Sequence, residues 1–544
     1  MVKQSKFLVI IIFSFLFFAK VIGQNEQKPK LIIGIVVDQM RSEYIYRFQE
    51  NFSENGFKRI LKGGFNNKNT HYNYLPTATA PGHASIYTGT TPSNHGIVGN
   101  EWYSQALKKK MYCAEDPESY LIGIKETTGV KVTKYSRSPK NLLASTITDE
   151  LKLFSNGKSK VIGVSLKDRG AIFPAGHLAD YAFWYHSESG KFITSSYYSK
   201  KLPSWLIAFN DKNLSDSLLN LTWELTLPEH KSKSGPDNNH FEKHFVGKPN
   251  SNFPYDIKKL RVNNGDFSLL TELPFGNTLL TKMAKATILG EKLGQSNQTD
   301  MITISFSSTD YIGHYYGIRS KELEDTYIRL DQNLSELFQF LDGNIGQDNY
   351  LLFLTADHAA ADNPEFLKEN RLPGGFYSIP DIKKRLNSNL STKFGEQNYV
   401  SFIDKTQIYL EASNKPYDSI LEYSKELLKN IEGVRGLFVP NNRSLNINSN
   451  VMQFMENSYH PINSGDILIN FYPGWMDNIP FGTTHYSNYN YDTHVPLLWF
   501  GKGVKHGETV SYNSITQIAP TLSFLMDIPL PNMSNKNPIV EIFE

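Results

Sequence analysis

The stretch LIIGIVV, residues 31–37, consists of apolar residues with one glycine among them, and Asp38 follows it directly. A run of this length and composition is typical of a strand that is buried on both faces of a parallel sheet. Four further runs have the same character: VIGVS (161–165), MITISF (301–306), YLLFLT (350–355) and PLLWF (496–500). We expect all five to be buried parallel strands.

Helical patterns alternate with these strands. They cover LLASTITDELKLF (142–154), GNTLLTKMAKATILGEKLG (276–294), ELEDTYIRLDQNLSELFQFLD (322–342) and ITQIAPTLSFLMD (515–527). In the third of them, five apolar residues share one stripe: Tyr327, Leu330, Leu334, Leu337 and Phe338. This alternation predicts an α/β fold in which a mostly parallel central sheet is sandwiched by helices. Two segments, about 180–275 and 375–480, break the rhythm, and we interpret them as insertions.

The N-terminus has the pattern of a secretory signal peptide, predicted over residues 1–23. Lys3 and Lys6 precede an apolar run from Phe7 to Ala19, and Gly23 follows shortly after. Because that run is too short to span a membrane, we expect cleavage and an exported protein, periplasmic or secreted, without a stable membrane anchor. Residues 24–544 would then form one elaborated catalytic domain and, we expect, a monomer.

Charge and cysteine content exclude some functions. Removing the predicted leader takes away three lysines and no acid, so the formal charge changes from +2 to −1. A nearly neutral chain without a long basic run does not favour nucleic-acid binding. Cys113 is the single cysteine, so an internal disulfide is impossible and metal ligands would have to be His, Asp or Glu.

Acidic and histidine side chains collect beside the predicted strands, and open α/β sheets bind ligands at the carboxyl ends of their strands. They are Asp38, Asp310, His314, Asp357, His358 and His485. Each has an ordinary structural explanation, such as a helix cap, an i,i+4 surface pair or turn chemistry. Together, however, they supply three oxygen or nitrogen ligands for each of two metal ions. Spacing alone leaves both explanations open.

The segment TATAPGH (77–83) presents a second open choice. Thr77 or Thr79 could cap the short helix that follows, as threonine often does ahead of a proline. Either could instead be a nucleophile, which would need a base, a metal or a strong local dipole.

Taken in order, these motifs resemble the alkaline phosphatase superfamily. The resemblance is strongest to the PafA-type bacterial alkaline phosphatases, which are related to the nucleotide pyrophosphatase/phosphodiesterase branch. It also includes Asn100 in GNEW, the segment SLKDRGAIFPAGH (165–177) and the aromatic YAFWY that follows, and it extends over essentially the whole mature chain.

The resemblance implies two zinc ions per chain, one held by Asp38, Asp357 and His358 and the other by Asp310, His314 and His485. It assigns Thr79 as the nucleophile that forms a phosphothreonine intermediate, and leaves Thr77 as a loop or capping residue. Phosphoryl oxygens would be bound by Asn100, Lys167 and Arg169. Without the resemblance, the two charged residues of that set would be interpreted as a solvated loop.

The chain departs from the family pattern at one position. Tyr486 follows His485 where the family usually has glycine. His494, in YDTHVPL, is therefore a competing ligand, although its place immediately before a strand suits a core or supporting histidine better. We retain His485 as the predicted ligand.

The expected function is that of a zinc-dependent alkaline phosphatase that hydrolyses small phosphate monoesters and releases inorganic phosphate. The alternative is a phosphodiesterase or nucleotide pyrophosphatase of the same superfamily. A sulfatase is disfavoured because its formylglycine arises in a C/S-x-P-x-R motif, whereas Cys113 lies in CAEDP. A secreted binding protein with a decayed enzyme fold is disfavoured because all six ligands and the nucleophile are present.

Overall fold

The computed structural model describes residues 28–124, 137–411, 416–441 and 448–543. The predicted signal peptide, residues 1–23, lies outside these ranges. Within them, no helix combines the length and the apolar character needed to cross a membrane.

Four parallel strands form the centre of the main sheet. They are β12 (Tyr350–Thr355), β1 (Leu31–Val37), β11 (Asp300–Phe306) and β6 (Val161–Ser165), in that spatial order. Leu31 pairs in parallel with Asp300 on one side and with Tyr350 on the other. Every residue of the four strands is buried, which confirms the expectation drawn from their apolar runs.

The described part of the chain extends this sheet to eleven strands. One flank adds β19 (His494–Gly501), β2 (Phe65–His71), β20 (Gly507–Thr509) and β21 (Asn513–Ser514), and the other adds β7 (Tyr181–His186), β8 (Lys191–Ser195) and β5 (Leu121–Ile122). The predicted insertion 180–275 therefore begins with two strands of the main sheet.

The prediction that PLLWF is a parallel strand is wrong. It lies within β19, which runs antiparallel to β12, with Leu351 opposite Gly501. An antiparallel strand begins at the edge where its parallel neighbours end. The loop that precedes β19, and with it His485, is thereby brought to the carboxyl edge of the central strands.

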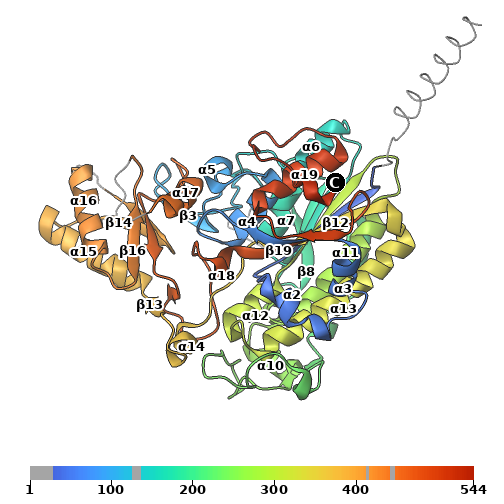
Figure 1. Ribbon diagram of the computed structural model, residues 1–544, viewed down its shortest axis with the longest axis horizontal. Helices are drawn as coiled ribbons and strands as arrows, with labels where there is room; N and C mark the ends of the chain where they lie inside the picture. Colours follow the sequence, from blue (N-terminus) through green and yellow to red (C-terminus); the bar gives the residue numbers. More distant parts are fainter. Residues whose placement is uncertain (1–27, 125–136, 412–415, 442–447, 544) are drawn as a thin grey trace, which may run out of the picture.

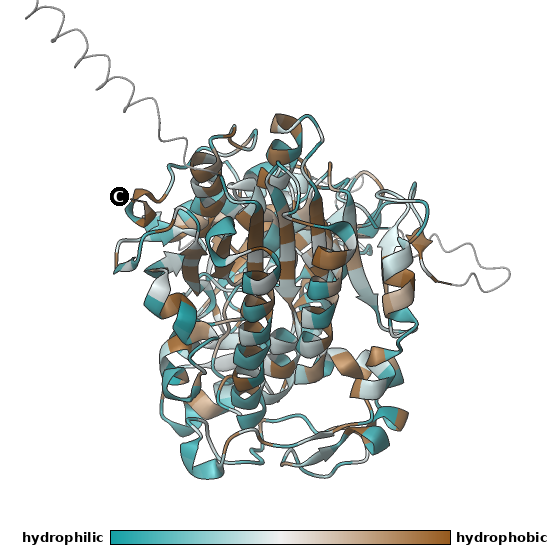
Figure 2. Cartoon of the chain, turned by 90° about the vertical axis from the view of Figure 1, so that its right-hand side faces the viewer, coloured by the Kyte–Doolittle hydropathy of each residue, from teal (hydrophilic) through white to brown (hydrophobic). Residues whose placement is uncertain are grey.

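Helices cover both faces of the sheet (Figure 1). One layer contains α4 (Thr79–Thr88), α6 (Ile147–Phe154), α7 (Asp168–Ala175) and α19 (Ile518–Met526). The other contains α3 (Phe57–Gly63), α8 (Ser204–Asn210), α11 (Pro274–Glu291), α12 (Ser308–Tyr316) and α13 (Lys321–Asn344). The predicted apolar stripe of α13 is buried, and Figure 2 shows the brown strands lying between helices of mixed hydropathy.

The described residues between 375 and 480 build a second lobe, drawn in orange in Figure 1. Its four-stranded sheet has the order β14 (Val400–Asp404), β15 (Gln407–Leu410), β17 (Ile467–Phe471) and β16 (Val434–Phe438). Helices α15 (Ile379–Phe394) and α16 (Tyr417–Leu428) pack on it around a separate apolar core that includes Leu386, Ile408 and Leu437. The turn between β14 and β15 carries Lys405 at a positive φ of 52°.

Candidate functional site

The six predicted metal ligands converge at the carboxyl edge of the central strands. Asp38 follows β1, Asp357 and His358 follow β12, and α12, which follows β11, carries Asp310 and His314. His485 lies in the loop before the antiparallel strand β19. The side chains form two groups, each of which could hold a metal ion: Asp38, Asp357 and His358, and Asp310, His314 and His485.

The first triad contains Asp38, Asp357 and His358, all fully buried. His358 Nε2 lies 3.5 Å from Asp38 Oδ1 and 3.7 Å from Asp357 Oδ2. These same three atoms are buried and have no hydrogen-bond partner among the described residues. Buried polar atoms without a partner are costly, so three of them within 4.8 Å of one another fit a candidate cation site.

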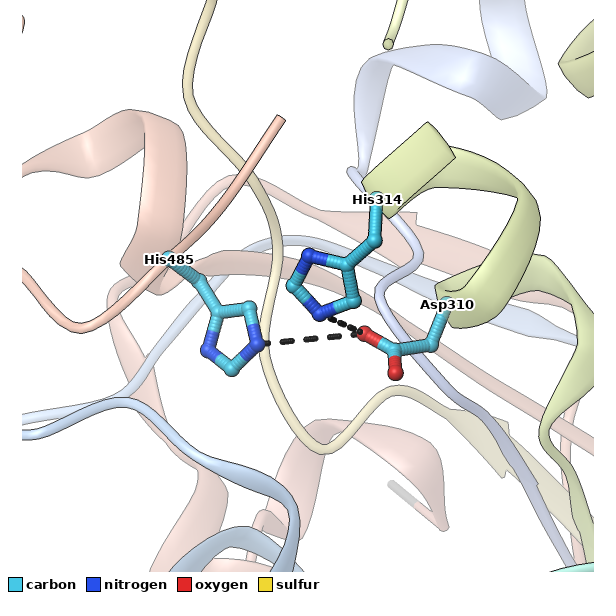
Figure 3. Close-up of side chains that lie close together, drawn as sticks. All are labelled: Asp310, His314 and His485. Atoms are coloured by element: carbon cyan, nitrogen blue, oxygen red, sulfur yellow. Dashed lines mark ion pairs between the residues drawn. The ribbon is translucent and has the colours of Figure 1, made fainter. Parts of the chain in front are cut away.

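The second triad is shown in Figure 3. Asp310 Oδ1 lies 3.1 Å from His314 Nε2 and 3.8 Å from His485 Nε2. The other ring nitrogens are held by main-chain carbonyls: His314 Nδ1 lies 2.8 Å from Thr483 O, and His485 Nδ1 lies 2.5 Å from Thr77 O. This arrangement directs both Nε2 atoms toward the carboxylate and fixes the tautomer that a metal requires.

Electrostatics also favours cations at this edge. Burial raises the pKa of Asp357 well above its usual value, and the charge of Asp38 raises it further. A divalent cation would relieve both effects, because it compensates the two carboxylates at once. The donor set contains oxygen and nitrogen without thiolate, which is the composition of catalytic rather than structural zinc sites. The residues therefore fit a pair of divalent ions.

The ammonium group of Lys167 contacts both triads. It lies 2.6 Å from Asp38 Oδ2 and 2.6 Å from Asp310 Oδ2, and the residue is 4% exposed. Burial lowers the pKa of Lys167, but the charges of Asp310 and Asp38 outweigh this effect and raise it above its usual value. The predicted alternative, a solvated loop, does not describe this side chain.

Thr79 is the first residue of α4, and the helix is capped by Ala78 without a side-chain hydrogen bond. The expectation that a threonine could cap this helix is therefore wrong for both candidates. Thr77 instead accepts a hydrogen bond from Tyr486 N at 3.1 Å and donates one to Ser487 O at 3.2 Å. Its hydroxyl thus holds the loop that carries His485.

Asn100 and α4 share a hydrogen bond that orients the asparagine. Its Oδ1 accepts from Ala80 N at 2.9 Å, which places the asparagine side chain beside the first turn of α4. The positive end of the helix dipole lies at the same place. Thr79, the Asn100 side chain and the N-terminus of α4 therefore lie close together.

Arg169, in the first turn of α7, is held by residues that the sequence did not suggest. Its Nη1 donates to Tyr112 Oη at 3.2 Å. Tyr112 in turn donates to Asp168 Oδ1 at 2.5 Å, and Arg137 Nε donates to Asp168 Oδ2 at 2.6 Å. A cavity of about 310 Å³, lined in part by Lys167 and Arg169, opens beside this network.

Gln39 also contacts the site, and the sequence did not predict this. It follows Asp38 with a positive φ of 63°, and it touches both triads: its main-chain N donates to Asp357 Oδ1 at 3.2 Å and its Nε2 to Asp310 Oδ1 at 2.7 Å. The only signal in the sequence was its position directly after a predicted ligand.

His494 is not part of either triad. Its Nε2 lies 2.8 Å from Lys68 O, and its ring stacks on His71 with the centroids 4.5 Å apart. The histidine that competed with His485 for the metal therefore faces β2.

A mostly parallel, helix-covered sheet with two neighbouring His/Asp triads at its carboxyl edge defines the class of α/β enzymes that have a candidate two-metal centre. The sequence model of the family described as type I phosphodiesterase / nucleotide pyrophosphatase matches residues 32–476. The chain belongs to this family. The family is metal-dependent, and the two triads supply candidate ligands.

Relatives of known name match along almost the full length. Alkaline phosphatase PafA of Elizabethkingia meningoseptica is 41% identical, covering 95% of this chain and 94% of that protein. Alkaline phosphatase PhoV of Synechococcus elongatus is 39% identical, with 96% and 94% covered. A protein of Myroides odoratus named calcium-transporting ATPase is 41% identical, with 97% of both chains covered.

The fold agrees with these relationships. The crystal structure of wild-type PafA superimposes with a TM-score of 0.90 at 40% identity and covers 95% of this chain and 99% of that one. The predicted superfamily and the predicted enzyme class, alkaline phosphatase, are therefore confirmed.

Proposed function

We propose that this protein is an exported, zinc-dependent alkaline phosphatase that hydrolyses small phosphate monoesters through a phosphothreonine intermediate on Thr79. The homology to PafA and PhoV supports phosphate monoester hydrolysis. The zinc ions, the nucleophile, export and a monomeric state are further parts of the same proposal. Export rests on the leader pattern at residues 1–23.

One observation carries the choice of monoesters: the buried ammonium of Lys167 lies 2.6 Å from a carboxylate of each triad. Near neutral or alkaline pH a phosphate monoester carries two negative charges and three non-bridging oxygens, whereas a diester carries one charge and two such oxygens. A fixed cation between the triads, with Arg169 nearby, suits the additional anionic oxygen.

Two zinc ions, bound by the triads, would supply charge neutralisation and would lower the pKa of hydroxyl groups beside them. In the first step the Thr79 hydroxyl gives up its proton to water, its oxygen forms a bond to phosphorus, and the bond from phosphorus to the ester oxygen breaks. The released oxygen takes a proton from water and leaves as an alcohol. Lys167, Arg169 and the Asn100 amide bind the non-bridging oxygens and keep the phosphoryl group in line with Thr79.

In the second step a water oxygen attacks the phosphothreonine. The bond between phosphorus and the Thr79 oxygen breaks, Thr79 regains its proton and inorganic phosphate leaves. The N-terminus of α4 favours the negative charge that develops on the Thr79 oxygen in both steps.

The phosphodiesterase alternative is favoured by the description of the family. A phosphodiesterase of this superfamily would use the same two triads, Thr79 and Asn100. These residues therefore do not distinguish diester hydrolysis from monoester hydrolysis. The region of Lys167 and Arg169 does distinguish them, because a diester carries a second substituent in place of one anionic oxygen.

The test is a parallel assay of one chromogenic phosphate monoester, the corresponding diester and the corresponding sulfate, with and without a chelator. The proposal expects the monoester to have the highest kcat/KM and the chelator to abolish activity. A preference for the diester would transfer the assignment to the phosphodiesterase alternative, and a preference for the sulfate would reject both.

A further inference from the structure

Tyr486 has a main-chain conformation that rarely accommodates a side chain. Its φ is +107°, in a region where glycine is favoured because it has no Cβ. Strained residues of this kind persist where the surrounding structure holds them, and they often lie at functional sites. This one directly follows His485, a residue of the second triad.

Hydrogen bonds fix the backbone on both sides of Tyr486. Its main-chain N donates to Thr77 Oγ1 at 3.1 Å, and the carbonyl of Ser487 accepts from the same hydroxyl at 3.2 Å. His485 Nδ1 lies 2.5 Å from Thr77 O. The direction of the Tyr486 side chain is therefore set by the segment that leads to Thr79.

The Tyr486 ring lies between the second triad and the second lobe. Its centroid is 4.1 Å from that of the His485 ring, and Lys405 Nζ, from the turn between β14 and β15, lies 4.9 Å from it. The phenol is also within electrostatic reach of Asp310 and Arg169. Because His485 and Lys405 already pack against the ring, its edge and hydroxyl are what it offers to a bound molecule.

The proposed reaction places the ester substituent on this side. Displacement in line puts the departing oxygen opposite the Thr79 oxygen. Helix α4, which begins with Thr79, packs on the first triad, since a Cβ on Gly82 would lie 2.2 Å from Asp357 O. The ester substituent therefore leaves toward the second triad, where an ion held by Asp310, His314 and His485 would compensate its charge, and it passes the residue next to His485. Glycine at that position would leave open space, whereas tyrosine supplies an apolar surface.

We propose that Tyr486 determines specificity for the ester substituent, by packing its ring edge against planar groups and so favouring aryl phosphates over alkyl monoesters. The inference rests on the proposed function. An aromatic edge meets the face of another ring favourably, because the edge is electropositive and the face electronegative. A methyl group has no such face and gains less from the contact.

The experiment compares kcat/KM for phenyl phosphate and methyl phosphate in the wild type, Tyr486→Gly and Tyr486→Phe, each at measured metal content. The change in the ratio of the two constants between the wild type and a variant cancels the difference in intrinsic reactivity between the esters. Glycine adopts the observed φ without strain, so the loss of the ring is not confounded by the backbone. Tyr197→Gly, a half-exposed tyrosine after β8 at the opposite edge of the sheet, is the matched control.

The aryl-to-alkyl ratio should fall about three- to tenfold in Tyr486→Gly, the size of one aromatic contact. It should change little in Tyr486→Phe, which keeps the ring, and in the Tyr197 control. Equal loss on both esters would overturn the proposal, since it would mean that Tyr486 acts only by positioning His485. A fall in Tyr486→Phe as large as that in Tyr486→Gly would also overturn it.

A binding measurement tests the role of Tyr486 independently of the proposed function. The affinities of phenylphosphonate and methylphosphonate, which have no ester bond to hydrolyse, are measured by calorimetry for the metal-loaded wild type and Tyr486→Gly. Selective weakening of phenylphosphonate supports the contact, and equal affinities in the two proteins overturn it. Failure of the wild type to hydrolyse either ester would instead reject the proposed function.

Discussion

The ammonium group of Lys167 lies 2.6 Å from the carboxylate of Asp310. The same group lies 2.6 Å from Asp38 Oδ2, so one side chain contacts a carboxylate of each triad. We therefore expect a substitution of Lys167 to affect metal binding by these two carboxylates as well as the proposed binding of substrate. The activities of Lys167 variants should consequently be compared at measured metal content.

The first prediction concerns metal removal. Exhaustive chelation should abolish monoester hydrolysis, and metal analysis of the active protein should find about two zinc ions per chain, because each triad provides three ligands and leaves a position open. Readdition of zinc should restore activity. Full activity in protein shown to be metal-free would reject the assignment of both triads.

The second prediction separates the two threonines. Thr79→Ala should remove phosphothreonine formation and lower kcat by orders of magnitude, because no other hydroxyl begins α4. Thr77→Ala should be far milder, since it loses only the hydrogen bonds to Tyr486 and Ser487. The measurements are turnover and mass spectrometry of the trapped intermediate. Equal effects of the two substitutions on folded protein would contradict the choice of Thr79.

The third prediction concerns Lys167 and Arg169. In the double variant Lys167→Ala plus Arg169→Ala, kcat/KM should fall far more for monoesters than for diesters. The preference for monoesters over diesters should therefore become smaller. Losing one preorganised donor typically costs about 10²–10³ in rate, and the two losses need not add because both groups act on one phosphoryl group. An unchanged ratio at equal metal loading would reject the role given to these cations.

The fourth prediction tests how Arg169 is held. Tyr112→Phe removes the hydroxyl that accepts from Arg169 at 3.2 Å and donates to Asp168 at 2.5 Å. Monoester kcat/KM should fall about three- to tenfold, the value of a hydrogen bond, while diester hydrolysis should change less. Tyr198→Phe, which removes a hydroxyl bonded to Gly176 O, is the control. The same loss on both substrates would indicate a purely structural role.

The fifth prediction concerns pH. Burial raises the pKa of Asp492 from 3.8 to about 7, although its bonds to Ser487 oppose the shift. A carboxyl group with a raised folded-state pKa contributes stability that is present below the unfolded value and is lost as the pH rises through the folded value. The free energy of unfolding should therefore fall between pH 5 and pH 8, by an amount on the order of 2–3 kcal/mol from this group.

Asp492→Asn should remove that part of the pH dependence, because asparagine can still accept from Ser487 but does not ionise. Urea unfolding at pH 5 and pH 8, with the exposed Asp348→Asn as control, measures it. If the variant and the wild type lose equal stability between the two pH values, Asp492 is not the titrating group.

Much of the fold could be predicted because its information is local. The apolar runs of β1, β6, β11 and β12 are long enough to require burial on both faces, and the stripe on α13 has the helical period. The positions of Asp38, Asp357 and His358 follow from the same logic, since parallel strands end at one edge and place whatever follows them together. The family motifs then favoured a metal site over ordinary caps and turns as the interpretation of these residues.

The tertiary structure decided what depends on pairing between distant segments. The direction of β19 is not encoded in its apolar run, because a buried strand has the same composition whether it runs parallel or antiparallel to its neighbour. The contacts of Tyr112 with Arg169, of Gln39 with Asp310 and of Thr77 with Tyr486 join residues that are far apart in the chain. Periodicity reports which face of an element is apolar, but a hydrogen bond depends on where two elements meet, and only the packed chain fixes that.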